Sequence, residues 1–233
     1  GSSDTAMPTF PSWDRIVLEQ AYPYIDYISL HKYYEYPGGD RTRKQDFLAS
    51  YVDLDGFIST VASTIRYVKT LKRSQHEVYI SLDEWNVWHK RDCFSDRENR
   101  GISVAREECL YDFLDAVVFS TLICTFVNHA DVVKIACLAQ LVNVLAPIMA
   151  KPSGELIKQS IFHPFMLASH YCVGEVYQTM VTCDTFSSMY GEAKEVVATA
   201  VGQEDGGVCL LVVSLSEEEI SLDLELEQFG KIS

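Results

Sequence analysis

Apolar positions along the first two thirds of the chain follow two helical patterns. From Asp53 onward they recur three and four positions apart, as on one helix face; they are Leu54, Phe57, Ile58, Val61, Ile65 and Val68. We predict a helix with Asp53 as its N-cap and with Lys69 and Lys72 at the negative end of its dipole. A second helix is predicted over about 107–127, with an inner face made of Leu110, Phe113, Leu114, Val117, Val118 and Thr121.

Short β-rich runs alternate with these helices. They cover residues 24–30, 78–83 and 132–142, and a charged loop at 90–100 follows the second run. The third run is nearly all apolar, which is expected of a strand covered on both faces. The order strand, helix, strand, helix, strand predicts βαβ units on a parallel sheet. Three strands are too few for an eight-stranded barrel, so the sheet is either small and open or the second half of a barrel.

The pattern changes after Pro147. The runs 163–181, 195–201, 207–215 and 219–229 are short and strand-like, with turn residues between them. In the last run, leucines alternate with acidic residues, which predicts a half-buried antiparallel strand. We therefore expect an α/β part over residues 1–160 and an all-β part over residues 161–233.

Composition narrows the possible partners. The 233 residues carry a net charge of -14, and 48% of them are apolar, so we expect a globular protein that does not bind nucleic acid or an anionic membrane. The longest apolar run, 116–127, is too short for a membrane span. Seven cysteines are scattered singly, which predicts free thiols and a cytoplasmic location. The opening "GSS" suggests either an expression scar or a start within a longer protein.

Polar and aromatic side chains gather where the three predicted strands end. The three segments are residues 31–35, 83–88 and 140–143, and strand ends of this kind form the concave face of a parallel α/β protein. Carboxylate, imidazole, phenol, amide and indole groups suit a carbohydrate site, because sugars offer both hydroxyl edges and C–H faces. Adjacent strand residues point to opposite faces, so we expect only one of Asp83 and Glu84 to face the cleft, with the other structural.

Three segments carry a resemblance to glycoside hydrolase family 51, the α-L-arabinofuranosidases: "YIDYISLHKYY", "ISLDEWNVWH" and "NHADVVKIACLAQLVNVLAPI". The resemblance implies a (β/α)8 TIM barrel followed by a β-sandwich. Residues 1–160 would then be the C-terminal half of the catalytic barrel, and residues 161–233 an incomplete β-sandwich. It also implies a retaining enzyme that releases terminal α-L-arabinofuranosyl residues from arabinan or arabinoxylan oligosaccharides, with no cofactor or metal, as a homo-oligomer.

The same resemblance assigns roles to five residues. Glu84 would be the nucleophile, and Tyr33 would donate a hydrogen bond that orients it. His31 and Gln140 would hold the arabinofuranosyl ring, and Trp88 would wall the pocket. Core packing remains an equal alternative for Trp88, and Asp83 is expected to be a hydrogen-bond partner rather than a catalytic group.

One element of the family pattern is missing. The general acid/base of the family is a Glu that follows an Asn, and no Asn-Glu dipeptide occurs in the sequence. Glu35 and Asp83 are the only local substitutes, so we expect the chain alone to be inactive. Two alternatives stay open: the same scaffold acting on xylosides or β-glucans, and a sugar-binding module without catalysis.

Overall fold

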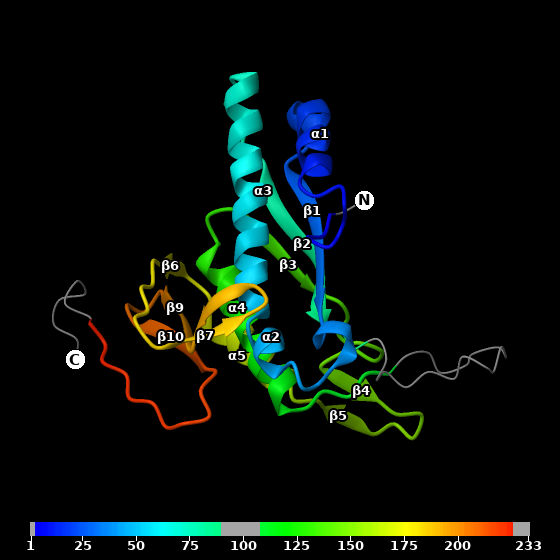
Figure 1. The fold of residues 1–233 in the computed structure, drawn as a ribbon, viewed down its shortest axis with the longest axis vertical. Coiled ribbons are helices and arrows are strands. Elements are labelled where there is room, and N and C mark those ends of the chain that lie inside the picture. Colours follow the sequence, from blue (N-terminus) through cyan, green and yellow to red (C-terminus); the bar gives the residue numbers. More distant parts are fainter. Residues whose placement is uncertain (1–2, 90–107, 226–233) are drawn as a thin grey trace.

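The computed structural model describes residues 3–89 and 108–225 of the chain (Figure 1). The α-helices are α1 (Ser12–Ala21), α2 (Lys44–Leu48), α3 (Ser50–Lys72), α4 (Phe113–Asn128) and α5 (Phe162–Tyr171). The strands are β1 (Tyr27–Tyr34), β2 (Tyr79–Val87), β3 (Val133–Leu138), β4 (Ile148–Ala150), β5 (Leu156–Lys158), β6 (Glu175–Tyr177), β7 (Thr185–Ser188), β8 (Gly191–Lys194), β9 (Val196–Gly202) and β10 (Val208–Ser214). Short 3-10 turns cover Tyr22–Tyr24 and Pro37–Gly39.

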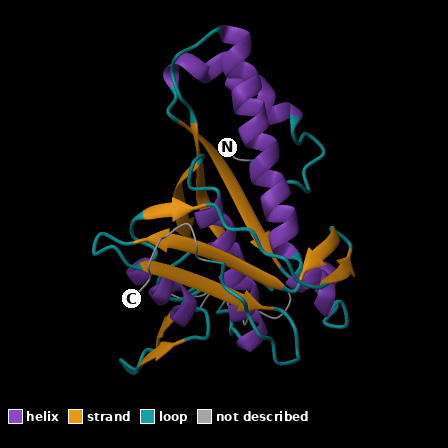
Figure 2. Cartoon of the chain, turned by 90° about the vertical axis from the view of Figure 1, so that its left-hand side faces the viewer, coloured by secondary structure: helices purple, strands orange, loops and turns teal. Residues whose placement is uncertain are grey.

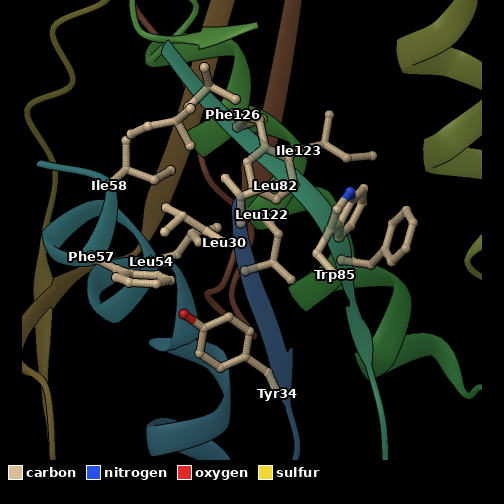
Figure 3. Close-up of a cluster of buried hydrophobic side chains, with 14 of the residues drawn as sticks. Leu30, Tyr34, Leu54, Phe57, Ile58, Leu82, Trp85, Leu122, Ile123 and Phe126 are labelled. Carbon is tan, nitrogen blue, oxygen red and sulfur yellow. The ribbon is translucent and has the colours of Figure 1, made fainter. Parts of the chain in front are cut away.

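A parallel three-stranded sheet of order β1-β2-β3 forms the first part, as the sequence predicts. Helices α3 and α4 lie against one face of it (Figure 1). Figure 3 shows the core between these layers, where Leu30 and Leu82 of the sheet meet Phe57 and Leu122 of the helices; all four are almost fully buried. The other face of the sheet carries the polar strand-end residues.

Helix α3 begins at Ser50, three residues before the predicted start, and Ala49 is its N-cap. The prediction that Asp53 is the N-cap is therefore wrong. The Asp53 carboxylate instead accepts a hydrogen bond of 2.9 Å from the Tyr34 hydroxyl and lies 3.0 Å from Nζ of the buried Lys32. Asp53 thus balances a buried cation on the helix-covered face of β1, a role that local sequence pattern does not reveal.

Helix α4 begins later than predicted. Asp112 caps it, because its side chain accepts the Asp115 N–H while the Asp115 side chain accepts the Asp112 N–H. Leu110 lies before the helix, Phe113 is its first residue, and both are exposed, so their predicted place on the inner face is wrong. Val118 and Thr121 are buried as expected.

Strand β3 is shorter and more exposed than predicted. It ends at Leu138, and only Val133 among its residues is buried. The expectation of cover on both faces is wrong, because four of the six residues of β3 are exposed.

The second part is built from short antiparallel strands, with the sheet β10-β9-β6 and the hairpin β7-β8 (Figure 2). The strands predicted at 195–201 and 207–215 are confirmed as β9 and β10. The strand predicted over 163–181 is wrong in its first half, which forms α5, because its apolar residues pack α5 against α4. Residues 219–225 form no strand, and the rest of that run lies outside the described residues.

Hydrogen bonds connect the second part to the helices of the first. The Met189 N–H donates to Asp46 Oδ1 at 2.6 Å, and the Tyr51 hydroxyl donates to the Lys194 carbonyl at 3.0 Å. The Asn128 amide donates to the Ala198 carbonyl at 3.0 Å. The hairpin β7-β8 and the strand β9 are thus tied to α2, α3 and α4.

Two sequence expectations about the chain as a whole can be compared with the structure. Five cysteines are free: Cys124, Cys137, Cys172, Cys183 and Cys209. Cys109 is disulfide-bonded, so the free-thiol prediction is wrong for Cys109. In residues 3–89 and 108–225, none of the helices has the length and apolar content needed to span a bilayer. The predicted charged loop at 90–100 lies outside the described residues.

Candidate active site

A β-bulge in β2 shapes the candidate site. Leu30 pairs with Leu82 and His31 with Glu84, so Asp83 is an extra residue in β2. The two adjacent carboxylates therefore lie on the same open face of the sheet, where both side chains approach His31. The prediction that only one of them faces the cleft is wrong, because the bulge cancels the alternation of the strand.

His31 and Tyr33 bracket the Glu84 carboxylate. The Tyr33 hydroxyl donates to Glu84 Oε2 at 3.1 Å, and His31 Nδ1 lies 3.3 Å from the same oxygen. The second ring nitrogen, Nε2, lies 3.4 Å from Asp83 Oδ1, which also accepts a hydrogen bond of 2.7 Å from Ser29. His31 can donate to both carboxylates when both of its nitrogens carry hydrogen.

The phenol of Tyr33 is held in its neutral, donating form. Burial raises the pKa of Tyr33, and its hydrogen bond to Glu84 raises that pKa further. The ring of Tyr33 also meets Trp88 edge to face, with centroids 5.3 Å apart. Glu84 itself is about half exposed, at 49% of its side chain, and so remains open to a ligand.

Trp88 begins a segment that is anchored in the interior. The backbone N–H of Trp88 donates to the Tyr34 carbonyl at 2.8 Å, and its side chain is partly buried. The next residue, His89, is buried and places Nε2 2.7 Å from Asp115 Oδ1 at the start of α4. The ring of His89 stacks on Tyr36 at a centroid distance of 5.3 Å. These contacts fix the chain just beyond β2.

Gln140 lies in a tight loop that follows β3. Its side chain is exposed, and within the described part of the chain no hydrogen bond joins it to Glu84, His31 or Tyr33. The loop contains Asn143 and Val144 at φ values of 60° and 65°. A left-handed conformation at a β-branched residue such as Val144 costs on the order of 1–3 kcal/mol, so surrounding contacts must hold it in place.

The structure thus brings together four of the five residues predicted from the sequence: His31, Tyr33, Glu84 and Trp88. Gln140 lies in the loop after β3, and within residues 3–89 and 108–225 no side-chain hydrogen bond joins it to these four residues. Sequence reasoning missed Ser29, which holds Asp83. The period-2 spacing of Ser29, His31 and Tyr33 could have placed the serine on the same face.

Away from the strand ends, the described residues form a groove but no metal cluster. Among residues 3–89 and 108–225, no group of three or more His, Cys, Asp or Glu side chains is arranged to hold a metal ion. A groove of about 520 Å³ lies between α1 and α3 and is lined in part by Arg15, Ser63 and Tyr67. It lies on the helix layer and includes none of the strand-end residues.

Comparison with known proteins places this fold and site in a family. The sequence model for the α-L-arabinofuranosidase C-terminal domain matches residues 83–233, which is more than half of the chain and includes Glu84. The chain therefore belongs to the α-L-arabinofuranosidase family that this domain defines.

Individual relatives agree with this assignment. An intracellular exo-α-(1→5)-L-arabinofuranosidase 1 of Bacillus subtilis is 40% identical over 98% of this chain and 46% of its own length. A solved family 51 α-L-arabinofuranosidase of Bifidobacterium longum superposes with a TM-score of 0.79 and 35% identity, over 92% of this chain and 44% of that one. The arabinose complex of a Thermotoga maritima α-L-arabinofuranosidase superposes with a TM-score of 0.67 and 27% identity. The match covers 88% of this chain and 41% of that one. The chain spans about half the length of the relatives it matches.

Proposed function

We propose that this chain is the C-terminal part of a retaining α-L-arabinofuranosidase that releases terminal arabinofuranosyl residues from arabinan or arabinoxylan oligosaccharides. The observation that carries the proposal is the Glu84 carboxylate, half exposed at the end of a parallel strand and bracketed by Tyr33 and His31. The family assignment and the names of the relatives support the choice of sugar.

Glu84 acts as the nucleophile in this scheme. A nucleophile of this kind must be ionised and accessible, and it forms a covalent glycosyl-enzyme that water then hydrolyses. The hydrogen bond from Tyr33 and the nearby His31 nitrogen orient one carboxylate oxygen, which leaves the other free to attack the anomeric carbon. His31 and Gln140 hold the ring, and Trp88 with Tyr33 supplies an aromatic wall.

The proton donor comes from outside this chain. A retaining enzyme needs a second carboxyl group about 5–5.5 Å from the first, on the other side of the scissile bond. We do not assign this role to Asp83, because its carboxylate accepts a hydrogen bond from Ser29 and approaches the same His31 ring as Glu84. We therefore propose that the chain alone does not turn over substrate, and that the donor lies on another part of a longer protein.

We also propose that the open sheet is half of a barrel. Residues 1–160 would form the C-terminal half of a (β/α)8 barrel, and residues 161–233 part of a β-sandwich. Within the described residues, β3 has a neighbouring strand on one side, and the outer edge of β1 is bridged by Ser3 at Leu30, so further strands can pair along the rest of these two edges. The complete protein would work in the cytoplasm as a homo-oligomer and would need no cofactor.

A chimera tests the proposal. The part of the Bacillus subtilis relative that precedes its match to this chain is joined to residues 1–233, and the product is assayed on an aryl α-L-arabinofuranoside. We expect hydrolysis, and we expect a mechanism-based arabinofuranosyl label to attach to Glu84. The Glu84→Gln variant should lose activity, while Glu19→Gln, which alters a partly buried acid paired with Arg15 on α1, should retain it.

Other results of the chimera assay would contradict the proposed nucleophile or the proposed substrate. A label on another residue, or full activity in the Glu84→Gln chimera, would overturn the assignment of the nucleophile. Faster hydrolysis of an aryl xyloside or β-glucoside would favour a different glycosidase on the same scaffold. Binding of arabinose-containing oligosaccharides without any product would favour a sugar-binding module.

A further inference from the structure

Asn86 makes an unusual set of contacts two residues beyond Glu84. It is fully buried in β2, where it pairs with Tyr33 in the sheet register. Its amide nitrogen donates to the Ala139 carbonyl at 2.8 Å and to the Leu145 carbonyl at 2.5 Å. Its amide oxygen accepts the Val87 N–H at 2.8 Å. Both amide hydrogens and one acceptor site are therefore used.

The two carbonyls that Asn86 binds stand at the two ends of one loop, residues 139–145. A bond of 3.2 Å from the Gln140 N–H to the Leu145 carbonyl also closes this loop. A single side chain on the strand of Glu84 thus fixes both ends of the segment that carries Gln140.

The loop needs such a fixture because its backbone is strained. Asn143 and Val144 both have positive φ values, and Val144 is β-branched. Glu108 holds Val144 from one side, since its carboxylate accepts the Val144 N–H at 2.9 Å. Asn86 holds the loop from the other side. Loss of Asn86 would let the backbone relax and would carry Gln140 with it.

We propose that Asn86 is a positioning residue that sets Gln140 relative to Glu84 by clamping the loop 139–145 to β2. The same loop carries the exposed side chains of Leu141 and Val142. The catalytic meaning of the clamp rests on the proposed function, whereas its structural meaning can be tested on this chain alone.

Amide hydrogen exchange provides the structural test. In the Asn86→Ala chain, we expect the amides of Gln140 and Val144 to exchange at least tenfold faster than in the parent chain. The amide of Ile80, within β2, should be unchanged. Asn128→Ala is the matched control, because it also removes a side-chain amide bonded to a carbonyl, in this case that of Ala198. It should leave the loop 139–145 unaffected.

A double-mutant cycle in the chimera provides the functional test. If Asn86 acts through Gln140, Asn86→Ala should raise KM about tenfold with a smaller change in kcat, and Glu84 should still take the label. The double variant Asn86→Ala/Gln140→Ala should lose no more than Gln140→Ala alone. Asn86→Ser, which retains one hydroxyl donor, should give an intermediate loss and covers the case in which the alanine variant fails to fold.

The outcomes separate this inference from the proposed function. Unchanged exchange in the loop, or additive losses in the cycle, would overturn the role of Asn86. Faster amide exchange in the loop of the Asn86→Ala chain would support the clamp even if the chimera takes no label at Glu84. The absence of that label would refute the proposed nucleophile.

Discussion

The buried pair of His89 and Asp115 gives a quantitative prediction about stability. The perturbation is His89→Phe, which keeps an aromatic ring against Tyr36 and removes the ring nitrogen that lies 2.7 Å from Asp115 Oδ1. The control is His129→Phe, because His129 Nε2 lies at the same distance, 2.7 Å, from Asp55 Oδ1. The two pairs match in chemistry and length and differ in exposure.

The exposure sets the magnitude. The Asp115 side chain is 2% exposed and that of Asp55 is 61% exposed. Removal of a hydrogen bond to a buried charged group costs about 1.5–3 kcal/mol, and loss of an exposed pair costs about 0–1 kcal/mol. Asp115 keeps the bond from the Asp112 N–H, so we expect a loss of about 2 kcal/mol for His89→Phe. In a chain of this size, that corresponds to a fall in Tm of about 4–8 °C.

Urea unfolding followed by circular dichroism measures both variants at pH 7. The expected result is a lower midpoint for His89→Phe with an unchanged slope, and a midpoint for His129→Phe close to that of the parent chain. Equal losses in the two variants would refute the reasoning, because burial could then not be the source of the difference.

Three further predictions concern single residues. Tyr33→Phe in the chimera should slow labelling of Glu84 about fivefold, because removal of the 3.1 Å hydrogen bond costs about 1 kcal/mol; an unchanged rate would exclude an orienting role. Burial raises the pKa of Tyr51 to about 12, so the phenol loses its proton at a lower pH in the unfolded chain than in the folded one. The urea concentration at the unfolding midpoint should therefore decrease as the pH is raised from about 10 to about 12, and it should decrease less steeply in Tyr51→Phe. Phe57→Ala should destabilise the chain by about 3–5 kcal/mol, whereas Tyr67→Ala, on the exposed side of α3, should cost less than about 0.5 kcal/mol.

Periodicity in the sequence predicted the parts of the fold that depend on one covered face. The helix around Phe57 and the strand β1 have regular apolar spacing, because each of them buries one face. Apolar spacing did not predict the structure of segments that lack a regular apolar period. The sequence predicts a strand where α5 forms, because the spacing in short apolar runs does not distinguish a strand from a helix.

The candidate site was predictable in its residue types and less so in its geometry. His31 and Tyr33 fall on one face by simple alternation, and both lie near Glu84 as expected. The bulge that turns Asp83 to the same face inserts one residue without a sequence signal, so its position depends on pairing with β1. The sequence also does not predict the role of Asn86, because its side-chain amide donates to backbone carbonyls more than fifty residues away.

The hydrogen bonds between the hairpin β7-β8 and the helices have a consequence for genetics. Tyr51 belongs to α3, which covers the strands of the site, and Asp46 belongs to the neighbouring helix α2; they are bonded to Lys194 and Met189 of the hairpin, respectively. A disruptive allele in the hairpin would therefore loosen the support beneath Glu84 from a distance. In a loss-of-function screen, such alleles would map far from the strand ends and still score as null.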